Sequence, residues 1–319
     1  FTNFSLLYLG LLDQRELGSI EFESPKPLKR VGNSYCYDNP ASSKGYTTIG
    51  ESITVMLRQI IACYHNVCNG VQRRVGAIIT VPDYYFCAKK KLKEEIIKLG
   101  EDAGFREVVI IPERDAIMKV NEISFKRTNY VILCCGEAYN SYTVVSGRII
   151  VMQHPTRRYT GRNISIQIAN EIVNNRLPSD VKSYVNNMSS EQRKVFTKEI
   201  LFCTRVALVE FMSTQSFTVH LVAGREFNVE ISKEDLQPLI DKYIQTLLNH
   251  AHSHIGNALP SGDNSIFVCG DFAPLTHMKE FVCRKFGVNE EHVVIMAPSS
   301  FAEGALLSCP VISRVQDSS

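Results

Sequence analysis

The sequence predicts an α/β fold, because short apolar runs rich in β-branched residues alternate with patterns of helical spacing. Two of these runs, Val75 to Val81 and Glu107 to Ile111, each stop at a proline, which marks the start of a turn or loop. Between them, Lys89 to Gly100 has apolar residues at helical spacing among lysines and glutamates, namely Leu92, Ile96, Ile97 and Leu99. Strands joined by a crossover helix pair in parallel, so we expect this stretch to belong to an α/β core.

Length and composition bound the architecture. The chain has 319 residues, of which 45% are hydrophobic, and a chain of this size is expected to form two lobes. The formal net charge of +2 gives no bulk charge that would favour nucleic acid or an anionic membrane. No apolar run has the length of a membrane span. Residues 25–44 are rich in turn-forming residues, and we expect an exposed loop there.

Residues 79–86 read I-T-V-P-D-Y-Y-F, residues 103–105 read A-G-F, and residues 111–116 read I-P-E-R-D-A. These segments resemble the seventy-kilodalton heat-shock chaperones, which belong to the wider actin-like ATPase superfamily. In that family I-T-V-P-A-Y-F opens a helix, and A-G-L-x-V-x-x-I-x-E-P-x-A-A follows it. Weaker similarity in the same order extends the resemblance over residues 46–308.

The resemblance implies a two-lobed actin-like ATPase fold, which is ribonuclease-H-like, incomplete in lobe I. Lobe I would contain residues 1–127, with residues 298–319 returning to it as a C-terminal helix. Lobe II would contain residues 128–297, with an outer helical subdomain over residues 171–262. The return to lobe I depends on residues 297–305, which are similar to the family's N-P-D-E-A-V-A-Y-G-A-A.

The phosphate hairpin of lobe II has lost most of the family's pattern. In that fold the nucleotide sits between the lobes, and glycine-rich hairpins hold its phosphates. The family's D-L-G-G-G-T-x-D falls on residues 134–141, of which Gly136 alone is kept. Cys134 and Ser141 replace two acidic residues, and Glu137 would place a carboxylate beside the phosphate oxygens. We therefore expect no tight phosphate binding.

The adenosine-binding elements have changed in the same direction. The family's E-R-A-K-R-x-L-S falls on residues 204–211, where Thr204, Ala207, Leu208 and Phe211 replace its polar residues. The loop G-G-S-T-R-I-P falls on residues 269–275, which keep Gly270 and lose the arginine. We accordingly expect no catalytic residue, no cofactor and no metal site. Three glycines remain as remnants of the phosphate and adenosine loops: Gly136, Gly270 and Gly304.

The family's first phosphate hairpin, D-x-G-T-T, has no counterpart in residues 1–45. Either the sequence begins inside the family alignment, or an unrelated segment replaces the family's first strands. Both alternatives leave an open sheet edge at residues 75–81 or 108–111. We expect that edge to be covered by the apolar segment Phe1 to Leu12 or by a protein partner in a multi-subunit complex.

Cysteines and histidines offer weaker functional signals. The ten cysteines include no C-x-x-C pair, which favours buried thiols over a zinc site. In the sequence HAHSH, His250 and His254 would share one helical face, but two ligands are fewer than zinc usually needs. We therefore interpret His250, His252 and His254 as the polar end of a helix over residues 236–255.

A basic cluster is formed by Lys89, Lys90, Lys91 and Lys93. Such a cluster is usually a solvated helix face, and Glu94 and Glu95 balance it here. The functional alternative is a docking site for RNA or an acidic partner.

Three classes of function remain open. The first is a non-catalytic, nucleotide-independent relative of the chaperone ATPases, a pseudoenzyme that acts as a structural or interaction subunit of a larger assembly in the cytoplasm. The second is a working ATP-dependent chaperone ATPase, and the third is a protein that binds ATP without hydrolysing it. The residues lost from the expected nucleotide site favour the first class, because a fold alone does not establish an activity.

Overall fold

The computed structural model describes residues 28–31, 34–67, 75–83, 90–214, 216–222, 226–260, 264–297 and 299–308. The chain forms two compact units, which we describe separately. Unit 1 contains residues 3–126 and 299–319, and unit 2 contains residues 127–298. Both units combine helices with strands, which confirms the α/β class. Within the described ranges, no helix combines the length and the apolar character needed to cross a bilayer.

The predicted strand-helix-strand segment is present in unit 1. Strand β4 (Ala77–Val81) pairs in parallel with β5 (Val108–Pro112), and helix α5 (Lys90–Ala103) connects them. Helix α3 (Ile49–Val67) packs against α5, and together they bury an apolar cluster against the two strands. Among the described residues, β4 pairs with β5 alone.

The expectation of a loop over residues 25–44 is wrong for most of its described part. Strands β1 (Leu28–Val31), β2 (Ser34–Asp38) and β3 (Tyr46–Thr48) form an antiparallel sheet there. In β2 the side chain of Cys36 is buried, whereas those of Tyr37 and Asp38 are more exposed. Turn-forming residues between these short strands obscured the pattern.

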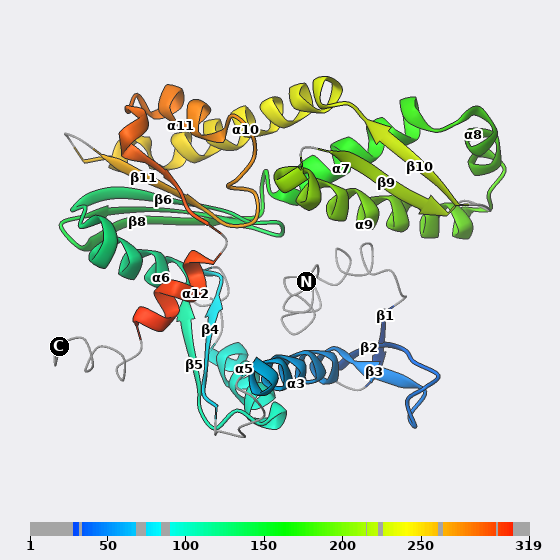
Figure 1. The fold of residues 1–319 in the computed structure, drawn as a ribbon, viewed down its shortest axis with the longest axis horizontal. Helices are drawn as coiled ribbons and strands as arrows, with labels where there is room; N and C mark the ends of the chain where they lie inside the picture. The colour runs from blue at the N-terminus through cyan, green and yellow to red at the C-terminus, as the bar shows by residue number, and fades with distance from the viewer. Residues whose placement is uncertain are drawn as a thin grey trace. The chain divides into compact units, whose positions relative to one another are not determined.

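The C-terminal helix α12 (Ser300–Leu307) packs against α6 (Glu113–Val120), which a π-helical turn over Asn121–Phe125 extends. Figure 1 shows α12 and α6 side by side. A side chain at Gly304 would place a Cβ atom 2.0 Å from the carbonyl oxygen of Ala116. The close approach of the two helices therefore requires glycine at this position.

A buried ion pair joins the ends of the two parallel strands. The Arg114 guanidinium, at the start of α6, donates to the carboxylate of Asp83, two residues after the end of β4, with an Nη1–Oδ1 distance of 3.0 Å. The Asp83 side chain is fully buried, whereas Asp115, which also contacts Arg114, is about half exposed. The pair ties Asp83 to the start of α6.

Unit 2 is built on a five-stranded mixed sheet with the order β12-β11-β6-β7-β8. Strands β6, β7 and β8 form an antiparallel meander, and β11 and β12 add in parallel beside β6. Helices α10 and α11 cover one face of this sheet (Figure 1). The bounds are β6 (Asn129–Cys135), β7 (Asn140–Ser146), β8 (Ile149–Thr156), β11 (Ser265–Cys269), β12 (Val293–Ile295), α10 (Lys233–Ile255) and α11 (Met278–Phe286), with 3-10 turns at Gly256–Ala258 and Glu290–His292.

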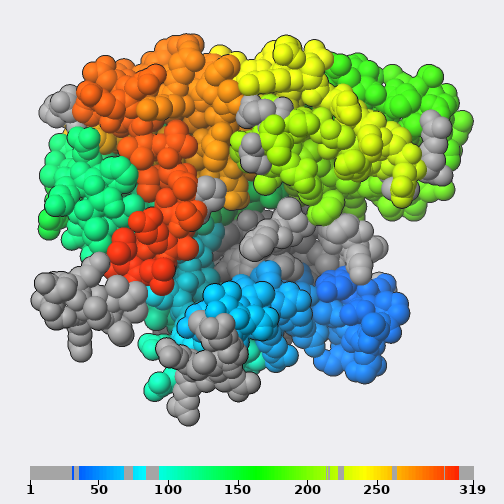
Figure 2. Space-filling model, viewed as in Figure 1, coloured from blue at the N-terminus to red at the C-terminus, as the bar shows by residue number. Residues whose placement is uncertain are grey.

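The outer part of unit 2 adds three helices and a β-hairpin between β8 and α10. Buried side chains run without a break from the sheet into this outer part, which appears in Figure 2 as one continuous green and yellow mass. The bounds are α7 (Gly161–Glu171) with a π-helical turn at Ile172–Arg176, α8 (Ser179–Asn186), α9 (Ser190–Thr214), β9 (Phe217–Val222) and β10 (Glu226–Ile231). The sheet and the outer part therefore share one hydrophobic core.

Candidate functional site

The turn after β6, the turn after β11 and the start of α7 meet at one edge of the unit 2 sheet. We call these three segments together the loop cluster. Asn140, which is fully buried, organises the first turn. Its side-chain oxygen accepts a hydrogen bond from the amide of Gly136 at 3.1 Å, and its side-chain nitrogen donates to the carbonyls of Arg158 and Tyr159 at 3.1 and 2.9 Å. The first remnant glycine therefore donates its amide to a side chain of the protein itself.

The start of α7 is the second component of this loop cluster. A helix N-terminus presents amide groups that bind anions well. Here the amide of Gly161 donates to the carbonyl of Gly136 at 3.0 Å, and the amide of Arg162 donates to the carbonyl of Glu137 at 3.1 Å. Thr160 and Asn163 form a capping box that satisfies further groups of the first turn. These amides bind the neighbouring turn and point at no empty anion site.

The turn after β11 closes the cluster from the other side. Gly270 has φ of +95°, and a Cβ atom there would lie 2.6 Å from the carbonyl oxygen of Cys135. The amide of Phe272 donates to that same carbonyl at 3.0 Å. The Phe272 ring is buried against Gly161, where an added Cβ would lie 2.0 Å from the ring. The glycines that remain in these turns are thus explained by close packing of the protein on itself.

An ion pair neutralises the carboxylate of Glu137, which the sequence predicted to be unfavourable for phosphate. Arg205, from α9, places its Nε atom 2.7 Å from Oε1 of Glu137, and the two side chains are only 6% and 16% exposed. Low exposure strengthens attraction between opposite charges and makes either charge costly without the other. The Glu137 carboxylate in the loop cluster is therefore paired with a cation of the protein itself.

The apolar face of α9 has a packing role. Thr204, Ala207, Leu208 and Phe211 are all nearly or fully buried, and the three apolar ones belong to the central core of unit 2. The Phe211 ring also meets Phe217 edge to face, with ring centroids 6.4 Å apart. The residues that replace the polar pattern of the resemblance thus form part of the core.

Two thiols meet where the resemblance would place an acidic residue. Cys134 and Cys269 are register partners on β6 and β11, and their sulfur atoms lie 3.1 Å apart in the buried sheet. Burial also raises the pKa of the neighbouring Cys135 thiol far above its usual value, which keeps that thiol protonated. The sequence could not reveal this contact, because the two cysteines are far apart along the chain. Cys68, Cys87 and Cys309 lie outside the described residues.

The remaining predicted residues are distributed as follows. Gly136 and Gly270 both border the loop cluster, whereas Gly304 belongs to unit 1 and contacts α6. Lys90, Lys91 and Lys93 are in α5, but Lys89 and the segment Phe1 to Leu12 lie outside the described residues. The proposed docking role of the lysines stays a prediction.

The histidines of HAHSH point in two directions from α10. The ring of His252 stacks edge to face on Phe286, with centroids 5.5 Å apart. His250 and His254 instead lie on the face of α10 that meets β8, where His154 joins them. The pKa values of His154 and His250 lie below the usual histidine value. The larger cause is partial burial, and the smaller one is the nearby His254 ring. His154 was not predicted as a member of this group, since nothing near it in the sequence indicates that it meets the other two histidines.

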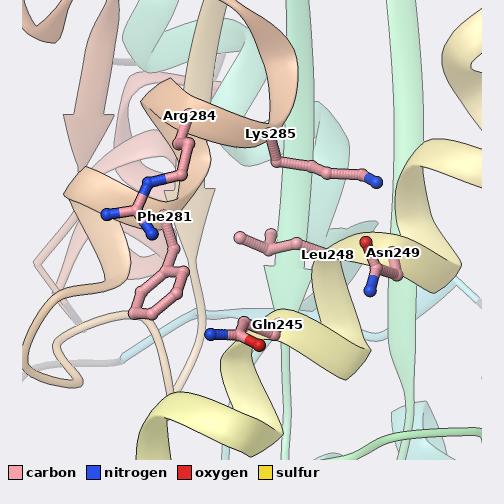
Figure 3. A pocket seen from close by; sticks show the side chains of 6 residues that line it. All are labelled: Gln245, Leu248, Asn249, Phe281, Arg284 and Lys285. Atoms are coloured by element: carbon pink, nitrogen blue, oxygen red, sulfur yellow. The ribbon is translucent and has the colours of Figure 1, made fainter.

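A surface hollow of about 340 Å³ lies between α10 and α11, and its lining residues are Gln245, Leu248, Asn249, Phe281, Arg284 and Lys285 (Figure 3). Arg284 forms an ion pair with Glu280 one turn earlier and lies 5.1 Å above the Phe281 ring. The lining residues include no carboxylate or histidine, which are the commonest groups in acid–base catalysis.

Comparisons with known proteins leave the site to be interpreted from its geometry, since no protein-family model and no curated protein matches the chain.

Proposed function

We propose that this chain is a nucleotide-independent relative of the heat-shock chaperone ATPases, with a two-lobed actin-like fold, that serves as a structural or interaction subunit of a larger cytoplasmic assembly. The observation that carries the proposal is the buried ion pair between Glu137 and Arg205. It occupies the turn that would hold phosphate if the resemblance to the chaperones is correct.

The topology of unit 2 supports the fold assignment. The resemblance requires a hairpin around Gly136, and β6 and β7 form that hairpin. It also requires a strand that ends at Gly270, and β11 ends at the preceding residue, in parallel with β6. Parallel strands whose ends meet at one edge of a sheet place their loops together, which is where ligands of open α/β sheets usually bind.

The loop cluster argues against a bound nucleotide. A phosphate oxygen at about 4 Å from an unpaired carboxylate meets a repulsion on the order of 4 kcal/mol at an effective dielectric constant near 20, and the ion pair with Arg205 reduces this repulsion at Glu137. A phosphate that contacted Arg205 would compete with Glu137 for its charge, and the amides of Gly136, Gly161 and Arg162 already donate to acceptors of the protein. A nucleotide would therefore have to break an ion pair and several hydrogen bonds.

Exposed strand edges support a role in protein contact. Strand β8 is the last strand of the unit 2 sheet among the described residues, and Ile149 and Val151 on it are 69% and 51% exposed. In unit 1, β4 and β5 pair only with each other in the described part of the chain. Exposed apolar edges recruit a further strand or aggregate, so we expect a partner segment to add by β-augmentation.

Thermal melting with and without magnesium ATP tests the absence of a nucleotide site. A ligand at about 100 times its dissociation constant adds about 2.7 kcal/mol of stability, which raises the melting temperature by several degrees in a chain of this size. We expect no shift beyond that given by magnesium alone. A reproducible rise in the melting temperature with ATP would instead favour the alternative that this chain binds ATP without hydrolysing it.

Amide exchange of the purified chain tests the partner. If a partner covers the edge of unit 1, the chain alone should associate or should exchange rapidly at residues 78–81. A well-behaved monomer with strong protection there, and with no protection in residues 1–12, would remove the support for a partner at this edge.

A further inference from the structure

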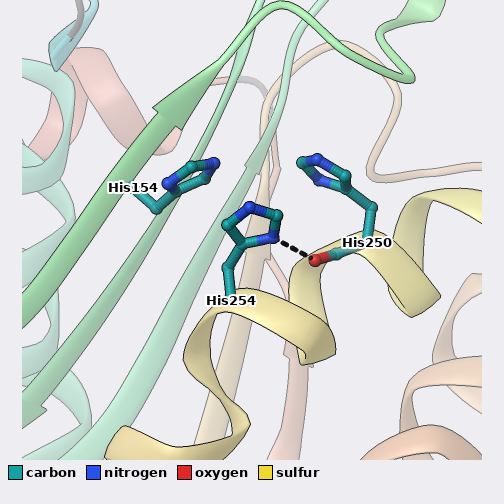
Figure 4. A group of neighbouring side chains, drawn as sticks. All are labelled: His154, His250 and His254. Atoms are coloured by element: carbon teal, nitrogen blue, oxygen red, sulfur yellow. Dashed lines mark hydrogen bonds between the residues drawn. The ribbon is translucent and has the colours of Figure 1, made fainter.

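Three histidines from two elements converge on one point in unit 2. His154 comes from β8, and His250 and His254 come from α10, one helical turn apart. One ring nitrogen of each lies within 4.8 Å of the others. Figure 4 shows the three rings turned toward a common space between the strand and the helix. Ring centroids are 3.9 Å apart for His154 and His254, and 4.3 Å apart for His250 and His254.

The hydrogen bonds of the two helical histidines leave their outer nitrogens available. Nδ1 of His254 lies 2.9 Å from the carbonyl oxygen of His250, which can only accept, so this nitrogen carries the proton. Nε2 of His254 then keeps its lone pair. Nδ1 of His250 contacts the hydroxyl of the buried Tyr142 at 3.3 Å, which likewise directs its Nε2 outward. Histidines that bind metal usually hold their second nitrogen in this way, with a hydrogen bond to a carbonyl or another fixed group.

We propose that His154, His250 and His254 bind a divalent transition-metal ion, with Zn²⁺ as the expected ion and water in a fourth position. Three imidazoles with one open position are a known zinc donor set, and imidazole also suits copper and nickel. Tetrahedral zinc, with bonds of about 2.0–2.1 Å, requires nitrogens about 3.4 Å apart, so the rings must close slightly. His254 is exposed and the other two are half-buried, which leaves room for that closure and for the water.

Zinc binding to the purified full chain, stripped of metal with a chelator, tests the proposal. We expect calorimetric titration with Zn²⁺ to give one saturable site, and Mg²⁺ to give none at the same concentrations, because Mg²⁺ prefers oxygen ligands. Bound Co²⁺ should report tetrahedral coordination in its visible absorption. Absence of saturable zinc binding would overturn the proposal.

Histidine variants separate this site from binding by the cysteines. Loss of a residue that only hydrogen-bonds to a metal ligand typically weakens metal affinity roughly 10–100-fold. Because His154→Gln and the exposed His254→Gln each remove a ligand itself, each should weaken zinc binding by at least this factor. His252→Gln is the matched control, because it removes a histidine of the same helix that faces Phe286, and it should bind zinc as tightly as the unaltered chain. Zinc binding that survives both His154→Gln and His254→Gln would contradict the assignment, and the circular dichroism of each variant verifies its fold.

Discussion

The loop cluster and the histidine cluster of unit 2 are both formed by polar groups from separate elements, yet they differ in balance. In the loop cluster, Glu137 meets Arg205, and the nearby amides meet carbonyls and a side-chain amide. In the histidine cluster, three identical imidazoles face one another. Polar groups that pair with one another need no ligand. Imidazoles brought together are instead stabilised by a metal ion that accepts a lone pair from each of them. The comparison therefore supports the proposal that a ligand binds at the histidines and not at the site that the resemblance would suggest.

The largest expected effect follows from breaking the ion pair of the loop cluster. Arg205→Met leaves the Glu137 carboxylate buried without its counter-charge, which should lower the free energy of unfolding by about 3–5 kcal/mol. Chemical denaturation measures this loss. The double variant Glu137→Gln/Arg205→Met should recover most of it, and a cost below about 1 kcal/mol for the single variant would show that the cluster is not held by this pair.

The buried ion pair of unit 1, between Asp83 and Arg114, is expected to contribute less to stability than the pair of the loop cluster. Asp83→Asn removes the fully buried carboxylate, but Arg114 keeps Asp115 at 3.2 Å on its exposed side. We therefore expect a smaller loss, about 1.5–3 kcal/mol, which is typical of a hydrogen bond to a charged group. The same denaturation assay measures it, and Asp115→Asn, which changes the exposed acid, should cost less. The reverse order would contradict the geometry of the pair.

Close packing of the loop cluster predicts a difference between two glycines. Both Gly270 and Gly147 have positive φ, but an added Cβ atom meets Cys135 backbone only at Gly270 and open space at Gly147. Gly270→Ala should therefore destabilise the protein by about 1–3 kcal/mol more than Gly147→Ala. Equal losses in parallel melts would mean that the turns after β6 and β11 are loosely packed.

The smallest effect is expected in the metal-free histidine cluster. His254 is exposed and faces like groups, so His254→Gln should change the stability of the metal-free chain by no more than about 0.5 kcal/mol. Adding zinc should then stabilise the unaltered chain and not the variant. A large loss in the absence of metal would indicate that the histidines serve the packing of α10 on β8.

The sequence predicted the parts of the fold that depend on local pattern. The strands and the helix between residues 75 and 112 have clear periodicity, and β4, α5 and β5 confirm them. The first sheet was missed, because β1 and β2 are short strands set among turn-forming residues.

The candidate sites depend on contacts that one sequence does not reveal. Glu137 was recognised as unfavourable for phosphate, but its partner Arg205 lies on a distant helix. The two helical histidines were recognised as neighbours from their spacing, whereas His154 reaches them only because β8 lies under α10. Long-range pairing of the sheet, which sets these neighbours, leaves little signal in local sequence.

Equilibrium dialysis of the purified chain against labelled ATP and magnesium tests the central claim most directly. If the Glu137–Arg205 pair and its neighbouring hydrogen bonds fill the expected phosphate site, the chain will retain no ATP above the level of an unrelated protein of similar size. Saturable retention that depends on magnesium, and that Arg205→Met abolishes while the variant stays folded, would contradict the account.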